Sequence, residues 1–362
     1  MPTYKRFYAI IILAIFFFTQ NLISGEPREK VKVIHNPSKG LWEGNPSKKV
    51  TITHLLTLGV EKGDPDQEFY RPRAVVVNDS GDIYILDSGN YRVQKFDKDG
   101  HFLMSFGRKG KGPGEMLYSY DMTIDKAGNI YISDDKNSRV EVFSGNGKFL
   151  YVFNVPSNPF QIEVDSQRFV YIKLGHVVAG FGKNLIFKFD SKGHLITSFV
   201  KTIKDRDTMV MHAKNSITTC LDKDNYIYVS HDFDYRIDKY DTKGNLILEF
   251  DRKLSYSIPT PTVTRTKESV GVLTPHTVNS IACDNQGLIY VLLAGKDKEY
   301  MKENGNLIID VFNSEGKYLT KIPLGRSLIN KIYVDSKRNL YLIDTWNQMK
   351  VYKYALKFGG KE

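Results

Sequence analysis

The sequence predicts an all-β fold, a single six-bladed β-propeller of four-stranded antiparallel blades whose ring is closed by an N-terminal strand. The first observation is a sequence unit that recurs six times, about every 50 residues, which is typical of a propeller or a solenoid. The second is the composition, because 22 Tyr, 21 Phe and 28 Gly against 2 Trp favour strands and tight turns. The repeats therefore overrule the two or three domains that a length of 362 residues suggests.

The repeated unit is clearest in two neighbouring copies. The segment GDIYILDSGNYRVQKFDKDGHFL at 81–103 matches GNIYISDDKNSRVEVFSGNGKFL at 128–150 throughout. Weaker copies follow at 159–199, 217–250, 279–322 and 330–354. Each copy holds four short apolar or alternating runs separated by Asp, Asn and Gly, the pattern of an antiparallel meander. One meander cannot bury both of its faces, whereas six meanders stacked around an axis can.

The two ends of the repeat region predict how the ring closes. The sixth copy stops after its third strand, near residue 354. A strand without a repeat body lies at 50–58, and His54–Gly59 resembles Phe102–Gly107, which ends the first copy. We therefore expect 50–58 to be the outer strand of blade six, within a single propeller that spans 50–358.

The first residues predict export. Lys5 and Arg6 precede an apolar run at 7–18, and the small residues Ser24 and Gly25 follow. We interpret 1–25 as a signal peptide, with an uncleaved N-terminal anchor as the alternative. Residues 26–49 are polar and are expected to form a surface spacer. The protein would then be periplasmic or extracellular, would touch a membrane only through this N-terminal segment, and would not meet nucleic acid.

The composition excludes two broad classes. With 41% hydrophobic and 25% charged residues, the chain is neither wholly disordered nor a polytopic membrane protein. The net charge of +10 comes from 51 Lys and Arg against 41 Asp and Glu, scattered through the turns. Such a balance fits simple solubility or an anionic partner.

The two cysteines form neither a metal-binding spacing nor a disulfide framework. Cys220 lies two residues before Asp222, and Cys283 lies one residue before Asp284, at the ends of equivalent inner strands. Because side chains alternate along a strand, the two sulfurs should face opposite ways. We therefore expect two free, buried thiols.

The repeat resembles a known family. The pattern G-x-I-Y-I-x-D-x-x-N-x-R-V-x-x-F at 81–96 and 128–143 is similar to the NHL-repeat family of six-bladed propellers, and GRKGKGPGE at 107–115 resembles its bacterial exported branch. We interpret the motif residues as structural, because they recur and can close a turn with charge-assisted hydrogen bonds. The expected pairs, with their asparagines, are Asp87 with Arg92 and Asn90, Asp134 with Arg139 and Asn137, and Asp232 with Arg236.

The longest connections all fall on one rim of the expected ring, at 107–118, 173–184, 200–215, 251–277 and 293–306. Long loops that gather on one side indicate a binding face, and 255–275 would form a flap over the channel mouth. The predicted ligand-binding residues at this mouth are Arg71, Arg73, Tyr120, Asp121, His212, His276, Asn279 and Asn330. Gln161, Ser216 and Lys331 begin equivalent inner strands. Such a set suits an anionic or sugar-like ligand, although each residue could also be a solvated rim position.

The resemblance also raises enzyme functions. Exported peptide-amidating lyases of this type hold zinc with three histidines at one slot of the inner strands, but that slot here holds Arg73, Tyr120, Phe160, Ile217, Asn279 and Asn330. We therefore predict no catalytic residues, no metal site and no cofactor, with a divalent cation as a minor alternative. The predicted function is a non-enzymatic, monomeric binding or scaffold propeller that engages a protein, a peptide or an anionic envelope glycan. The alternative is a metal-assisted lyase or lactonase-like hydrolase.

Overall fold

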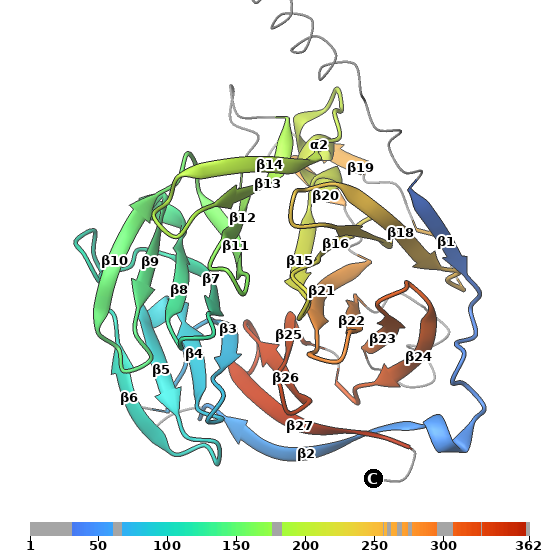
Figure 1. Ribbon diagram of the computed structural model, residues 1–362, viewed down its shortest axis with the longest axis horizontal. Coiled ribbons are helices and arrows are strands. Elements are labelled where there is room, and N and C mark those ends of the chain that lie inside the picture. Colours follow the sequence, from blue (N-terminus) through green and yellow to red (C-terminus); the bar gives the residue numbers. More distant parts are fainter. Residues whose placement is uncertain are drawn as a thin grey trace, which may run out of the picture. The chain divides into compact units, whose positions relative to one another are not determined.

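The blades of the propeller follow one another around a central axis (Figure 1). The computed structural model describes residues 31–60, 67–175, 183–255, 257–258, 262–265, 270–273, 277–294, 307–326 and 328–359. In these residues six blades of antiparallel strands are present, and their innermost strands contact in the ring order β3, β7, β11, β15, β21, β25 and back to β3. The predicted fold class is confirmed. The predicted signal peptide at 1–25 lies outside the described residues.

The first three blades each use four consecutive strands. Their bounds are β3 (Pro72–Val77), β4 (Ile83–Asp87), β5 (Arg92–Phe96) and β6 (Phe102–Phe106) for blade one, β7 (Ser119–Ile124), β8 (Ile130–Asp134), β9 (Arg139–Phe143) and β10 (Phe149–Asn154) for blade two, and β11 (Pro159–Val164), β12 (Val170–Leu174), β13 (Asn184–Phe189) and β14 (Leu195–Lys201) for blade three.

Of the other three blades, blades four and six each add one strand from the N-terminal part of the chain, and blade five again uses four consecutive strands. Their bounds are β15 (Ile217–Leu221), β16 (Ile227–His231), β17 (Arg236–Tyr240), β18 (Leu246–Arg252) and the added β1 (Lys32–Asn36) for blade four, β21 (Val278–Cys283), β22 (Leu288–Leu293), β23 (Ile308–Asn313) and β24 (Tyr318–Pro323) for blade five, and β25 (Lys331–Val334), β26 (Asn339–Asp344), β27 (Lys350–Phe358) and the added β2 (Val50–Leu58) for blade six.

Strand β2 closes the ring, as the sequence predicts. It pairs antiparallel with β27, from Val50 opposite Phe358 to Leu58 opposite Val351. Leu58 is buried in the core between blades six and one, and Ile52 packs on the core of blades five and six. The outer strand of blade six thus comes from one end of the repeat region and its other strands from the opposite end.

Part of the predicted spacer is bound to the blades. Strand β1 lies beside β18 at the outer edge of blade four. The Asn36 side chain donates hydrogen bonds of 2.8 Å to the carbonyl oxygens of Asp251 and Gly316, and it accepts one of 3.0 Å from the Tyr318 amide. The Trp42 amide donates to the Leu319 carbonyl at 2.8 Å. This segment therefore joins blade four to blade five, which periodicity alone does not reveal.

A buried tyrosine marks the second strand of every blade. The six residues are Tyr84, Tyr131, Tyr171, Tyr228, Tyr290 and Tyr341, each at most 3% exposed. In blade four, the Tyr228 hydroxyl donates to Asp222 at 3.2 Å, and the other oxygen of that carboxylate accepts the Asp224 and Tyr226 amides at 2.9 Å. Blades two, three, five and six repeat the tyrosine–aspartate contact. The aspartates thereby fix the tight turns of the rim opposite the long connections.

The prediction of two free thiols is wrong, because Cys220 and Cys283 form a disulfide with their Cα atoms 5.8 Å apart. The side chains do leave their strands on opposite faces, as the alternation requires. Neighbouring blades, however, pack face to face, so the side chains that meet between blades four and five come from opposite faces of equivalent strands. The predicted opposite orientation is therefore what brings the two sulfurs together.

The repeated aspartate–arginine pair is structural in the first blade. Arg92 Nε contacts Asp87 Oδ2 at 2.9 Å, and the Asn90 side chain donates to the same oxygen at 2.8 Å. In blade two, Arg139 Nε lies 3.5 Å from Asp134 Oδ2, and Asn137 also donates to that oxygen. These contacts fix the turn between the second and third strands.

In blade two the arginine also holds the glycine-rich connection at 107–115. Its guanidinium donates to the carbonyl oxygens of Lys111 at 2.6 Å and of Gly112 and Glu115 at 2.8 Å. The Glu115 carboxylate in turn accepts the Gly112 amide at 2.8 Å and contacts Arg108 Nε at 2.9 Å. These contacts hold the connection in a defined conformation beside blade two.

The predicted third pair, Asp232 with Arg236, is wrong. Strand β16 ends at His231, which is the register partner of Arg236, so Asp232 lies one residue beyond the motif position. Arg236 instead contacts Asp238 at 2.9 Å, and Asp238 also contacts His231 Nε2 at 2.8 Å. Asp238 thus replaces the missing motif carboxylate, and its pKa is lowered by the hydrogen bonds and charges of His231 and Arg236, although burial opposes this.

Two further elements lie on the rim of long connections. Helix α2 (Thr208–Lys214) occupies the connection before blade four, and its N-terminal Asp207 accepts the Met209 and Val210 amides. Strands β19 (Thr262–Arg265) and β20 (Val270–Leu273) pair as a hairpin within the predicted flap at 255–275. Among the described residues, no helix is long and apolar enough to cross a membrane.

Candidate functional site

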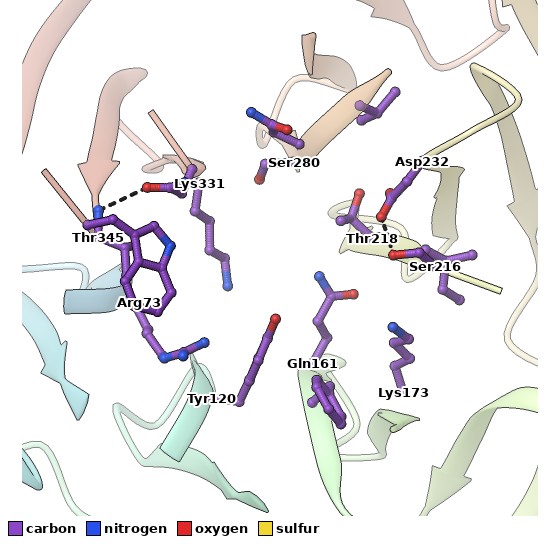
Figure 2. A pocket seen from close by; sticks show the side chains of 16 residues that line it. Arg73, Tyr120, Gln161, Lys173, Ser216, Thr218, Asp232, Ser280, Lys331 and Thr345 are labelled. Carbon is purple, nitrogen blue, oxygen red and sulfur yellow. Dashed lines mark hydrogen bonds between the residues drawn. The ribbon is translucent and has the colours of Figure 1, made fainter. Parts of the chain in front are cut away.

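A cavity of ≈ 340 Å³ opens where the inner strands begin, on the rim of long connections (Figure 2). Arg73, Tyr120, Asn279 and Asn330 of the predicted ligand-binding residues line it, as do Gln161, Ser216 and Lys331. Figure 2 shows Tyr120, Gln161 and Lys331 pointing into the same space from three blades. The structure brings these residues together, and their role in binding stays a prediction.

The other four predicted residues have different positions. Asp121, on the innermost strand of blade two, is buried beside the cavity. It accepts a hydrogen bond from Lys331, on the innermost strand of blade six. Arg71 lies at the rim, where its guanidinium faces the rings of Tyr70 and Trp346. His212 is exposed on α2, and His276 lies outside the described residues.

Arginine and aromatic side chains alternate along one side of the cavity. The guanidinium carbon of Arg71 lies 5.2 Å from the Tyr70 ring centre and 5.1 Å from that of Trp346. That of Arg73 lies 5.6 Å from Trp346 and 4.5 Å from Tyr120. We call these five residues the arginine–aromatic stack. Since both guanidinium groups lie over aromatic rings, the stack positions the two cations without neutralising their charge.

Both arginines of the stack have a further structural feature. Arg73 also donates from Nη2 to the Tyr118 hydroxyl at 2.7 Å, and its guanidinium lies 4.8 Å from the Tyr118 ring. Arg71 has a backbone φ of 57°, in the left-handed region that residues with a side chain seldom adopt. Strain of this kind often accompanies a functional site.

The opposite side of the cavity carries Lys173, which the sequence analysis did not single out. It lies on β12, and its Nζ is 5.4 Å from the ring centre of Phe160. Burial lowers the pKa of Lys173, and the negative charge of Asp232 opposes that change. Asp232, which accepts a 2.5 Å hydrogen bond from Ser216, is the one carboxylate among the described residues that line the cavity.

Among the buried polar atoms of the cavity residues, Arg73 Nε, Gln161 Oε1 and Thr218 Oγ1 have no hydrogen-bond partner within the described part of the chain. A buried polar atom left unpaired costs about 1–3 kcal/mol, so native proteins normally satisfy such atoms with a partner or with water. The cavity thus offers a polar ligand a charged donor, an amide acceptor and a hydroxyl group that can both donate and accept.

Deeper in the channel, Glu163 on β11 lies near Asp121 and Lys331. Loss of solvent raises the pKa of Glu163 from 4.5 to about 8; the charge of Asp121 adds to this rise, and that of Lys331 opposes it. The carboxyl group is therefore largely protonated at neutral pH in the folded protein.

This shift predicts the sign of a pH effect on stability. Because the folded state holds the Glu163 proton up to a higher pH than the unfolded chain, the free energy of unfolding should fall as the pH rises from about 5 to about 8. Glu163→Gln, which cannot ionise, should show a smaller fall in melting temperature over this range. The exposed Glu315→Gln serves as the control. An identical pH profile for the wild type and Glu163→Gln would contradict this assignment.

Metal binding receives no support from side-chain clusters. Among the residues that the structure describes, no three His, Cys, Asp or Glu side chains are grouped so that they could hold a metal ion.

The fold and the cavity define a six-bladed β-propeller with a polar, positively charged central site. A family model described as "6-bladed beta-propeller" (DUF5128) matches residues 66–272, which is more than half of the chain. The chain belongs to this family.

Other similarities are more distant. A curated relative, the "Protein brain tumor" of Drosophila melanogaster, is 43% identical over 51 residues, which cover 14% of this chain and only 5% of that protein. A DUF4221 protein of Bacteroides vulgatus aligns with a TM-score of 0.57 at 11% identity and covers 87% of this chain and all of its own. Virginiamycin B lyase of Staphylococcus aureus aligns with a TM-score of 0.51 at 12% identity, over 85% of this chain and 99% of its own. At these identities the structural matches bear on the fold alone.

Proposed function

We propose that this protein is an exported, non-enzymatic binding propeller of the NHL type that engages a protein, a peptide or a glycan through the rim of long connections. The observation that carries the proposal is the central cavity, in which buried polar atoms of Arg73, Gln161 and Thr218 lack partners among the residues that the structure describes. Binding sites of this kind combine a concave surface with a few convergent polar groups.

The charges of the cavity favour an anionic ligand. Three cations, Arg73, Lys173 and Lys331, line it together with the single carboxylate of Asp232. Lys331 contacts Asp121, whereas the guanidinium of Arg73 contacts a neutral hydroxyl and aromatic rings. A negatively charged group in the cavity would therefore compensate charge that the described residues leave in excess.

Export is supported by two features. Disulfides such as Cys220–Cys283 persist mainly in oxidising compartments. The charged and apolar order of the first 25 residues is that of a secretory signal. Both features fit a protein that meets its ligand outside the cytoplasm.

The proposed function is tested with arrays of bacterial-envelope glycans and of peptides. We expect the protein to retain at least one ligand class, and Arg73→Gln with Lys173→Gln to weaken that binding by roughly tenfold or more, because charge-assisted hydrogen bonds are lost. Lys98→Gln, a loss of charge in a tight turn of the opposite rim, is the matched control. Retention that is the same for all three proteins, or no retention at all, would overturn the proposal.

A further inference from the structure

We propose that the ligand is an acidic glycan of the uronate type, whose terminal sugar enters the cavity while the following sugars lie along the arginine–aromatic stack. This inference rests on the proposed binding function and names the ligand class of the same site. It depends on how two arginines, the mouth of the cavity and the polar groups of Gln161 and Thr218, which lack partners among the described residues, are arranged.

The stack provides two places for carboxylates. A guanidinium that lies over aromatic rings can still direct N–H donors at a planar acceptor such as a carboxylate. Arg73 presents Nε without a partner in the described residues, beside the cavity. Arg71, two residues earlier, lies outside the lining on the other flank of Trp346. A ligand with one carboxylate could use one arginine, whereas a chain with repeated carboxylates could use both.

The acceptors of the cavity favour sugar rings over acidic side chains. Gln161 Oε1 and Thr218 Oγ1 are buried and lack partners within the described part of the chain. The amide oxygen of Gln161 needs a donor from the ligand, and the hydroxyl group of Thr218 can both donate and accept. An ionised carboxylate has acceptors only, but each sugar hydroxyl both donates and accepts. An acidic peptide would bring one backbone N–H per residue, whereas a sugar ring brings several hydroxyl groups on a compact frame. Ser280 and Asn279 add further hydroxyl and amide groups to the lining.

The size and the edge of the cavity indicate a chain end. A volume of ≈ 340 Å³ is at the lower limit of the usual range for small-molecule sites, so the cavity accepts a terminal group and the rest of a polymer must lie outside. Trp346 is 52% exposed at this edge, between the two arginines. The exit from the cavity therefore leads directly onto the stack.

The test uses three probes of matched length in titration calorimetry: an oligomer of galacturonate, its methyl ester and an oligomer of glutamate. The galacturonate oligomer should bind most tightly, and the uncharged methyl ester should bind at least roughly tenfold more weakly. Arg71→Gln and Arg73→Gln should each weaken galacturonate binding by about tenfold. Lys98→Gln should change it by no more than about twofold, because it removes an exposed charge from a distant turn. Arg73→Lys, which keeps the charge but not the planar fork, should have an intermediate effect.

The outcomes separate this inference from the proposed function. If the glutamate oligomer binds more tightly than the galacturonate oligomer and the same arginine variants weaken it, the ligand is an acidic peptide, and only the glycan inference is wrong. If the methyl ester binds as well as the acid, Arg71 and Arg73 do not bind carboxylates of the ligand, and the glycan inference is wrong. If none of these probes and no array ligand depends on the cavity residues, both proposals fall. Circular dichroism of Arg73→Lys and Arg71→Gln shows whether a loss of binding reflects a loss of fold.

Discussion

A protein that begins at Val60, and so lacks β2, is expected to lose most of its stability and to aggregate. Its blade six would keep three strands, and β27 would become an unpaired edge over its whole length. The contacts of Ile52 and Leu58 with the cores of neighbouring blades would also disappear. We expect a loss of about 5 kcal/mol or more, which is comparable to the total stability of many domains.

The matched control is a protein that begins at Val50, which keeps β2 but lacks β1 and Trp42. It should remain folded, with a moderately lower melting temperature, because β1 adds only an outer fifth strand to blade four. Thermal unfolding followed by circular dichroism, together with size-exclusion chromatography, compares the two proteins. Equal melting temperatures would mean that the pairing of β2 with β27 does not hold the ring together.

Replacing both cysteines by alanine is expected to lower the free energy of unfolding by about 2–4 kcal/mol. The bridge closes a loop with a sequence separation of 63 residues and joins the innermost strands of blades four and five. Without it, the unfolded chain gains conformational freedom, and the two blades keep only their noncovalent contacts. Urea unfolding of the oxidised wild type, the reduced wild type and the double alanine variant measures the effect.

The same experiment includes a direct chemical check. The reduced wild type should unfold at nearly the same urea concentration as the alanine variant, since both lack the bridge. Alkylation of the denatured, unreduced protein should modify neither Cys220 nor Cys283, because no free cysteine is present among the described residues. Modification of both residues would restore the sequence-based prediction of free thiols.

Much of the fold could be predicted because the sequence unit that forms one blade recurs several times in the chain. The buried tyrosines and the Asp-containing turns recur in nearly every blade, so weak copies could be recognised from strong ones. The closing strand at 50–58 could be recognised by its likeness to an equivalent strand. Strand β1 has no such equivalent, and its position depends on the hydrogen bonds of Asn36 to residues more than 200 positions away. Local pattern carries no information about such contacts.

The site was predictable only where it follows the repeat. Arg73, Tyr120, Asn279 and Asn330 occupy one repeated slot, and all four line the cavity. Lys173, on a second strand, does not occupy that slot. Trp346, which also lines the cavity, lies two residues beyond the end of another second strand, β26. Lys173 lies within β12, whereas Asp232 and Trp346 lie one and two residues beyond the ends of β16 and β26, so the three residues share no repeated position that could have revealed them.

The same alternation explains the error over the cysteines. The orientation of each side chain along its own strand was predicted correctly. What was missing was the relation between blades, in which opposite faces of equivalent strands meet. A rule for one strand cannot by itself say which side chains of two stacked sheets will touch.

The closing strand also sets an order of events in folding. β2 leaves the ribosome early, yet its partner β27 is made last, about 300 residues later, so the final pairing must wait for the whole chain. Bringing such distant segments together costs conformational entropy, and proteins dominated by distant pairings therefore fold slowly. Until then, blade six is incomplete and the ring is open. Under the proposed export, a chain that crosses the membrane unfolded would close its ring only after the last strand has crossed.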